Sequence, residues 1–108
     1  MQPTRLQHNV ARYTDEIEAE MRRIGFWQGE PLRPEQLAFT QAFAMDTMTF
    51  AQWLQFIFLP RVREAVASNR FPGSSSVGTQ AVREFDGAAE ASRLVTLLAE
   101  FDGLIEEK

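Results

Sequence analysis

Three side chains that could do chemistry lie close together in the middle of this 108-residue sequence: Asp46, Trp53 and Arg61. A carboxylate beside a guanidinium and an indole can hold a ligand or a partner, and such a site would shift the pKa of the acid. In the competing structural interpretation, Asp46 accepts backbone N–H groups at the start of the following helix. Arg61 would then pair with an acid, or with a carbonyl that Pro60 leaves without a hydrogen bond. Both interpretations stay open, and both predict that the three residues lie near one another.

Two further residues extend this candidate site, Phe43 and Met45, which lie in the apolar stretch around Asp46. Trp53 and Met45 are expected to fill the core, as buried tryptophan and methionine usually do. Methionine also lines adaptable grooves, because its side chain is flexible and polarizable. One candidate binding site is therefore a pocket between helices, lined by Phe43, Met45, Trp53 and Phe56.

The familiar motifs for catalysis, metal binding and phosphate binding are missing from the sequence. It has no cysteine, and its one histidine, His8, lies off the apolar stripe of a predicted helix. A zinc site needs about four N, S or O ligands, which this composition does not favour. The serines at 74–76 have no neighbouring histidine to activate them, and neither Gly73 nor Gly78 is followed by a P-loop lysine. We therefore predict no catalytic residue, no metal and no cofactor.

The composition is that of an ordinary globular protein, with 44% hydrophobic and 24% charged residues, and it predicts a single domain over residues 1–108. The net charge of −4 argues against direct nucleic-acid binding, because gripping phosphates requires clustered cations. The four acids within residues 15–20 are interpreted as a solvated helix face rather than a metal site. No apolar run reaches the roughly 20 residues of a membrane span, and the N-terminus lacks a signal-peptide profile. We expect a cytoplasmic protein.

Apolar residues recur at three- and four-residue spacing, which predicts helices, and no segment alternates for long enough to be a strand. An amphipathic helix is expected over residues 4–24, followed by a glycine as its left-handed cap. Thr49 and Gln52 form a capping-box pattern that begins a nearly apolar helix over residues 50–68, kinked at Pro60.

The other segments complete a helical architecture. They are a short helix that begins at Pro34 with Phe39 and Phe43 on its inner face, a mobile loop at 70–78, a short helical piece at 80–85 and a last helix at 88–106. Proline suits the first turn of the short helix, and the glycine, proline and serine content predicts the loop. The predicted fold class is all-α: a compact, four-helix-bundle-like arrangement of three long helices plus one or two short ones.

The motifs of residues 40–61 resemble the signature of a known family. They are Thr40-Gln41-x-Phe43-x-Met45-Asp46-Thr47-Met48, then Trp53-Leu54-Gln55, then Pro60-Arg61. The remainder agrees more loosely, through Trp27 followed by Glu30-Pro31, a Pro72-Gly73 loop and a leucine-rich final helix. The sequence is thereby similar to the YqcC-like proteins over essentially its whole length. This resemblance implies an all-α bundle and an association with tRNA pseudouridine synthase C.

Three functional hypotheses follow from the residues and the resemblance. The first is a non-enzymatic bundle that binds another macromolecule, such as a tRNA-modifying enzyme. The second is a bundle that binds a small molecule or an acyl chain, and the third is a direct part in pseudouridine synthesis in tRNA. Pseudouridine synthases use an aspartate in an Arg-Leu-Asp context within a mixed α/β fold, whereas Asp46 lies in Met-Asp-Thr. We therefore prefer a protein partner in tRNA modification, and the sequence does not determine the oligomeric state.

Overall fold

The structure, a computed structural model, describes residues 2–107, and every regular element in that range is helical. The bounds are α1 (Arg5–Arg23), η1 (Pro34–Leu37), η2 (Ala42–Ala44), α2 (Phe50–Trp53), η3 (Leu54–Phe58), α3 (Leu59–Ser68), α4 (Val77–Glu84), η4 (Ala89–Ala91) and α5 (Ser92–Glu107). The predicted all-α fold class is confirmed. No helix within the described residues is long and apolar enough to cross a membrane.

Helix α1 begins and ends where its local sequence predicts. The Thr4 hydroxyl accepts the Gln7 N–H at 3.0 Å, and the Gln7 side chain accepts the Thr4 N–H at 2.7 Å. This reciprocal capping box satisfies two of the donors that a helix start leaves open. At the other end Gly25 adopts φ +79°, and the Phe26 N–H bonds to the Met21 carbonyl at 2.8 Å. Glycine reaches this left-handed conformation without a steric penalty.

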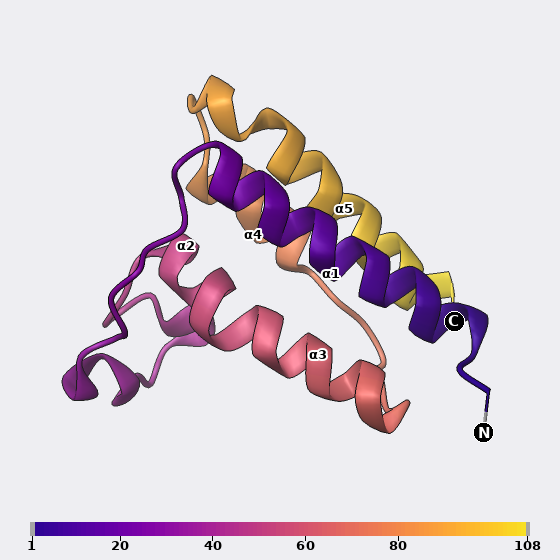
Figure 1. The fold of residues 1–108 in the computed structure, drawn as a ribbon. Coiled ribbons are helices and arrows are strands. Elements are labelled where there is room, and N and C mark those ends of the chain that lie inside the picture. The colour runs from indigo at the N-terminus through magenta and orange to yellow at the C-terminus, as the bar shows by residue number, and fades with distance from the viewer. Residues whose placement is uncertain (1, 108) are drawn as a thin grey trace.

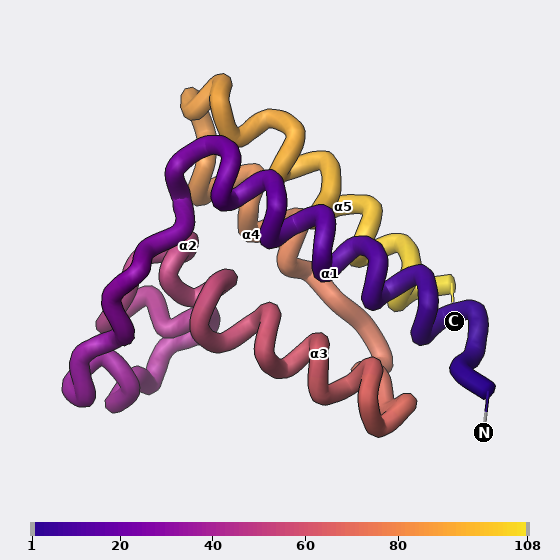
Figure 2. Tube along the Cα trace, in the orientation of Figure 1, coloured from indigo at the N-terminus to yellow at the C-terminus, as the bar shows by residue number. Residues whose placement is uncertain are grey.

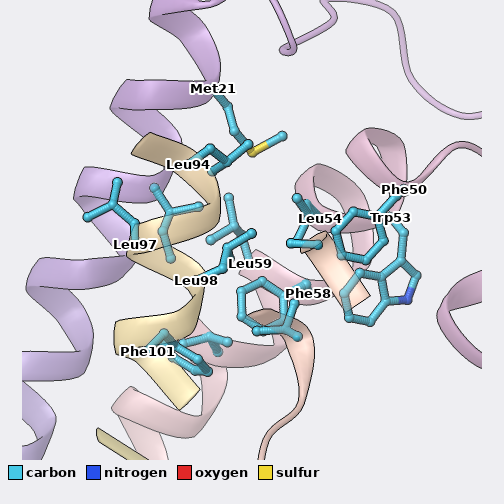
Figure 3. Packing of buried hydrophobic residues seen from close by; sticks show 14 of the residues in the cluster. Met21, Phe50, Trp53, Leu54, Phe58, Leu59, Leu94, Leu97, Leu98 and Phe101 are labelled. Atoms are coloured by element: carbon cyan, nitrogen blue, oxygen red, sulfur yellow. The ribbon is translucent and has the colours of Figure 1, made fainter. Parts of the chain in front are cut away.

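Two layers of helices enclose one core (Figure 1). Helices α1 and α5 pack side by side, α4 packs against α5, and α3 lies against α1 on its other side. The tube in Figure 2 shows the long connection from α1 returning past the start of α2. Buried apolar side chains from all five α-helices meet in a single cluster, part of which Figure 3 shows. The largest fully buried members include Ile17, Met21, Leu54, Leu59 and Leu94.

The central helix runs without a break from α2 through η3 to α3, as predicted for residues 50–68. Thr49 caps it, accepting the Gln52 N–H at 3.1 Å. The irregularity lies one turn before Pro60, where η3 is a π-helical turn and the Leu59 N–H bonds to the Leu54 carbonyl. A proline lacks the N–H of a regular helix and its ring clashes with the preceding turn. The π turn lets the helix continue past that position with one extra residue.

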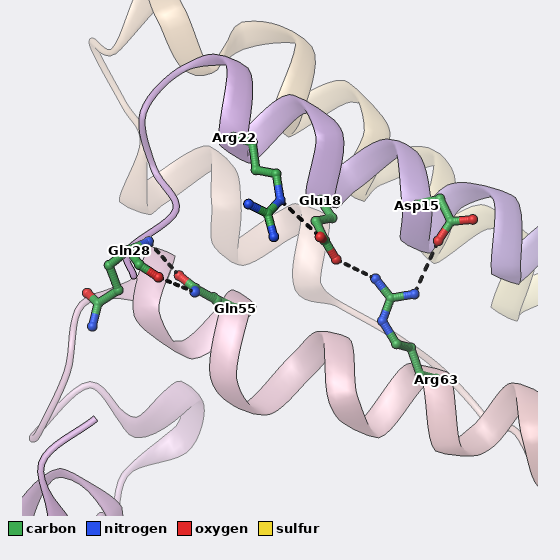
Figure 4. Close-up of polar contacts among 6 residues, drawn as sticks. All are labelled: Asp15, Glu18, Arg22, Gln28, Gln55 and Arg63. Atoms are coloured by element: carbon green, nitrogen blue, oxygen red, sulfur yellow. Dashed lines mark hydrogen bonds and ion pairs between the residues drawn. The ribbon is translucent and has the colours of Figure 1, made fainter. Parts of the chain in front are cut away.

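Ion pairs fasten the central helix to α1 (Figure 4). The Arg63 guanidinium lies 3.2 Å from the Asp15 carboxylate and 2.6 Å from that of Glu18. Glu18 also pairs with Arg22 of its own helix at 3.0 Å.

The interpretation of all four acids of residues 15–20 as solvated is wrong for Glu20, which is 5% exposed. A hydrogen bond from Arg23 lowers the pKa of the Glu20 carboxyl and keeps this acid charged at the edge of the core.

The short helix predicted from Pro34 is wrong in its extent. It ends at Leu37, and a separate 3₁₀ turn, η2, follows after a loop. Phe43 and Ala44 adopt positive φ angles of 57° and 53°, a conformation that breaks any right-handed helix. Aromatic packing accompanies this backbone, because the Phe43 ring lies 4.9 Å from that of Trp53. Tertiary contacts rather than local propensity therefore shape this segment.

The loop predicted at 70–78 ends earlier than expected, because α4 begins at Val77. Val77 and Gly78 are buried in the first turn of α4, so the short helix predicted at 80–85 begins three residues earlier. The cause is Asp102 of α5, whose carboxylate accepts the Val77 N–H at 3.1 Å and the Gly78 N–H at 2.8 Å. The Ser75 hydroxyl donates to the same carboxylate at 2.5 Å. An acid from a distant helix thus caps α4, a contact that local composition does not indicate.

Candidate functional site

A cavity of about 340 Å³ lies between the central helix, the 71–76 loop and the end of α5; we call it the Trp53 cavity. Its lining consists of Phe43, Trp53, Phe58, Arg61, Val62, Ala65, Phe71, Pro72, Ser74, Ser75, Ser76, Val77, Phe101 and Ile105. Aromatic and aliphatic side chains dominate, with three serines on the loop side. Within residues 2–107, Arg61 is the one charged residue of this lining. The cavity therefore combines an apolar interior with a single positive charge.

The π turn is what brings Trp53 onto the same face as the rest of this lining. From Phe58 onward, the central helix contributes positions 61, 62 and 65, which follow α-helical spacing of three, four and seven residues. Trp53 lies five residues before Phe58, one turn of a π-helix but not of an α-helix. The two rings are 5.5 Å apart. Phe56 was expected to line the pocket but does not. The extra residue of the π turn rotates the helix beyond it, so that Phe58 rather than Phe56 faces the cavity.

Arg61 projects from α3 as an exposed side chain. No acid among residues 2–107 forms an ion pair with it. The contrast with Arg63 is informative, since that residue lies only two positions further on and bridges Asp15 and Glu18. The pairing of Arg61 with Asp46, one of the alternatives left open by the sequence, is thus not made.

Asp46 holds its own loop together instead. Its carboxylate accepts the Thr40 N–H and hydroxyl, both at 3.1 Å, and the Gln41 N–H at 3.3 Å. The bond from the Thr40 N–H contributes most to lowering the pKa of the Asp46 carboxyl below its usual value. The interpretation that Asp46 caps the following helix is wrong. Thr49 caps α2, and the Asp46 carboxylate accepts hydrogen bonds from residues that precede it in the chain.

Met45 lines a second hollow on the other side of the same loop, which we call the Met45 groove. It measures about 610 Å³, and its lining consists of Gly25, Phe26, Gln28, Met45, Met48, Thr49, Phe50, Ala51, Gln52, Glu84 and Phe85. Met45 is 52% exposed, so the expectation that it fills the core is wrong. Its sulfur accepts a weak hydrogen bond from the Gln80 side chain at 3.8 Å. The structure therefore divides the five predicted site residues between two surfaces and one loop.

Phe43, Phe50 and Trp53 form an aromatic wall between the two hollows; Figure 3 shows Phe50 and Trp53 next to each other. The rings of Phe50 and Trp53 stack with 5.7 Å between centroids and 15° between planes. Phe50 faces the Met45 groove, whereas Trp53 and Phe43 face the Trp53 cavity. The Phe43 ring meets both of the others edge to face, at 5.9 Å from Phe50 and 4.9 Å from Trp53. Such geometry is favourable for aromatic pairs and fixes the wall in place.

A network of glutamines, which the sequence did not reveal, anchors this wall to the long 26–37 connection. The Gln28 N–H donates to the Gln55 side chain at 3.0 Å, and the Gln55 amide donates to the Gln28 carbonyl at 2.8 Å (Figure 4). Gln52 and Gln36 continue the network, with Gln52 donating to the Gln28 side chain at 3.0 Å. Gln55 is only 8% exposed. The one signal in the sequence was that two glutamines interrupt an otherwise apolar helix.

The remaining candidates stay outside these surfaces. His8 is exposed on α1. No group of three histidine or acidic side chains within the described residues is arranged to hold a metal ion. Neither hollow includes His8 or any of the four acids of residues 15–20.

Comparisons with known proteins show which family this chain resembles. The DUF446 family, described as tRNA pseudouridine synthase C, matches residues 9–104. The uncharacterized protein YqcC of Escherichia coli is 30% identical over 88 residues, which cover 82% of this chain and 80% of that protein. An uncharacterized protein of Haemophilus influenzae is 24% identical over 103 residues, covering 92% of this chain and 94% of its own length.

Two further matches differ in what they cover. The solution NMR structure of YqcC from Escherichia coli superposes with a TM-score of 0.84 at 24% identity, over 96% of this chain and 91% of that one. A tRNA pseudouridine synthase C of Pectobacterium carotovorum subsp. carotovorum is 36% identical over 62 residues, which are 57% of this chain but only 16% of that protein. With a family match over nearly its full length, the chain belongs to the DUF446 family of YqcC-like proteins.

Proposed function

We propose that this protein is a non-catalytic binding partner of tRNA pseudouridine synthase C. One observation carries the identity of the partner: a protein with that name contains a segment similar to this chain in 16% of its length. YqcC and the Haemophilus influenzae protein match over most of their own lengths instead. We infer from these two arrangements that the module acts beside the rest of the longer chain. Covalent linkage supplies a high effective concentration, and a separate module reaches the same state by binding.

The carboxylates of Asp46 and Asp102 hold loops through hydrogen bonds, which favours a binding role over a catalytic one for these two acids. The Asp46 carboxylate has three hydrogen-bond donors within its own loop, and its lowered pKa favours the charged form that they hold. The Asp102 carboxylate likewise has three donors, in the 75–78 segment. A catalytic acid or nucleophile needs access to the reacting atoms. Both carboxylates are instead occupied in holding loops.

The Met45 groove is the docking surface that fits such a partner best. Met45 is exposed and flexible, and Phe26, Phe50 and Phe85 provide aromatic surface beside it. Its one charged lining residue within the described range is Glu84, and the exposed Asp86 follows close by in the chain. An enzyme that acts on tRNA needs cations against the phosphates. A groove of mixed apolar and polar side chains that includes Glu84, on a chain of net charge −4, complements a basic surface of that kind.

The test is a binding measurement between this protein and purified tRNA pseudouridine synthase C from the same organism, with and without tRNA. We expect saturable binding that Met45→Lys weakens at least tenfold. Leu37→Lys is the matched control, because Leu37 is 56% exposed but lines neither hollow. Both variants place a lysine on the surface and should unfold at the temperature of the unsubstituted protein.

Three outcomes would contradict this proposal. Absence of binding to the synthase would show that it is not the partner. Equal weakening by the two lysine variants would show that the Met45 groove is not the docking surface. Conversion of uridine to pseudouridine in tRNA by this protein alone, abolished by Asp46→Ala, would establish the catalytic alternative.

A further inference from the structure

The Trp53 cavity has properties that the proposed docking role does not use. It lies across the aromatic wall from the Met45 groove, and its volume of about 340 Å³ is at the lower end of the roughly 300–1,000 Å³ of small-molecule sites. Trp53, Phe58, Phe101 and Ile105 are all at most 9% exposed and line its interior. We propose that this cavity binds a small amphiphilic carboxylate, with the apolar body inside and the carboxylate on Arg61.

The charge of the site selects an anion. Arg61 is exposed, lines the cavity and forms no ion pair within residues 2–107. The acid that contacts the loop side of the cavity wall is Asp102, and its carboxylate is occupied by Ser75 and by the first turn of α4. It therefore does not pair with the guanidinium. A guanidinium presents paired N–H donors whose planar geometry matches a carboxylate, and such bonds are among the strongest in proteins.

The number of charges favours a carboxylate over a phosphate monoester. Within the described residues, the lining offers one positive charge, and the chain as a whole carries −4. One arginine balances one carboxylate, whereas a phosphate monoester carries close to two negative charges. Ser74 and Ser76 also line the cavity, and a serine hydroxyl can donate a hydrogen bond to an anion.

The interior selects an apolar body. Trp53, Phe58 and Phe101 form a continuous aromatic series. The ring centroids of Trp53 and Phe58 are 5.5 Å apart, and those of Phe58 and Phe101 are 5.2 Å apart. Phe71 and Pro72 of the loop add further apolar surface to the lining. Each buried methylene of a ligand gains about 0.8 kcal/mol from leaving water. An acid with a short alkyl chain satisfies both the apolar interior and the arginine, while a fully polar anion satisfies only the arginine.

The experiment uses octanoate as the probe and Trp53 as the reporter. A Trp27→Phe background removes the other tryptophan, so that the fluorescence reports on the cavity; Trp27 lies elsewhere, with Arg22 over its ring at 4.6 Å. We expect a saturable change with octanoate, and at least tenfold weaker binding after Arg61→Gln. Arg63→Gln is the matched control on the same helix and should alter the affinity less than twofold. Octan-1-ol, the uncharged analogue, should bind more weakly and respond equally little to both substitutions.

A second measurement needs no substitution. In amide and indole NMR spectra of the unsubstituted protein, octanoate should shift the Trp53 indole and the backbone of residues 74–77, while the Gln28 amide stays unchanged. Absence of saturation in both experiments would overturn the inference, as would equal effects of Arg61→Gln and Arg63→Gln. Equal affinity for octanoate and octan-1-ol would overturn the role of the charge. The titration contains no synthase, so its outcome is independent of the docking proposal.

Discussion

Gly78 of α4 lies against the backbone of α5 at Ala99, and replacing it by alanine should destabilise the protein. A β-carbon built at this position would lie 2.5 Å from the Ala99 Cα and 2.7 Å from the Ala99 nitrogen. Carbon atoms in favourable contact are about 3.5–4.0 Å apart, so α4 would have to move outward by roughly 1 Å. Both obstacles are backbone atoms of a packed helix, which cannot rotate away. The same movement would lengthen the Gly78 N–H bond to Asp102.

The magnitude follows from these opposing contributions. Alanine in a helix is favoured over glycine by up to about 1 kcal/mol. Overpacking a tight contact costs about 1–3 kcal/mol, and weakening a hydrogen bond to a charged acceptor costs about 1.5–3 kcal/mol. We expect Gly78→Ala to lower the free energy of unfolding by roughly 2–4 kcal/mol. For a domain of this size, each kcal/mol lowers Tm by about 4 °C or more.

The assay is urea and thermal unfolding followed by far-UV circular dichroism, with Gly103→Ala as the control. Gly103 also lies in a helix, but a β-carbon added there would meet no heavy atom within 4 Å. That variant should gain up to about 1 kcal/mol from helix propensity alone. An unfolding midpoint for Gly78→Ala at or above that of the unsubstituted protein would refute the close-approach argument.

Two further predictions concern the polar contacts of the site. The folded pKa of Asp46 is lowered, so its contribution is complete above the unfolded pKa and is lost as the pH falls through the folded value. Asp46→Asn should therefore flatten the acid limb of the stability–pH curve, and parallel curves for the two proteins would contradict this. Gln55→Leu should lower the free energy of unfolding by about 1–3 kcal/mol, because it leaves the Gln28 N–H and carbonyl without their partner. Gln41→Leu, at an exposed position, should change it little in the same urea titration.

Local sequence signals were sufficient for the long helices. Apolar spacing predicted the first helix and Gly25 its end, and the Thr49 capping box marks the start of the central helix, because these signals act within a few residues. The segment from Pro34 onward was mispredicted, since the left-handed backbone at Phe43 accompanies contacts with Phe50 and Trp53 in the next helix. Local propensity carries no information about those contacts.

The site was predictable only in part, for the same reason. Of the three residues expected to lie near one another, Trp53 and Arg61 line one cavity, whereas Asp46 is not part of its lining. Asp46 was placed in the right segment but given the wrong partners, because its donors precede it in the chain. Asp102 was missed, since a single acid on an amphipathic helix gives no sign that it caps α4. Long-range hydrogen bonds of this kind depend on the tertiary arrangement alone.

The π turn in the central helix has a consequence for how this protein can change during evolution. A helix normally tolerates a one-residue deletion poorly, because every side chain beyond it rotates by about 100°. Here the deletion of Phe56 or Ile57 would convert the five-residue turn between Trp53 and Phe58 into a regular four-residue one. Trp53 would then still face the same side as Phe58 and Arg61. Relatives one residue shorter within 54–58 can therefore keep the same cavity.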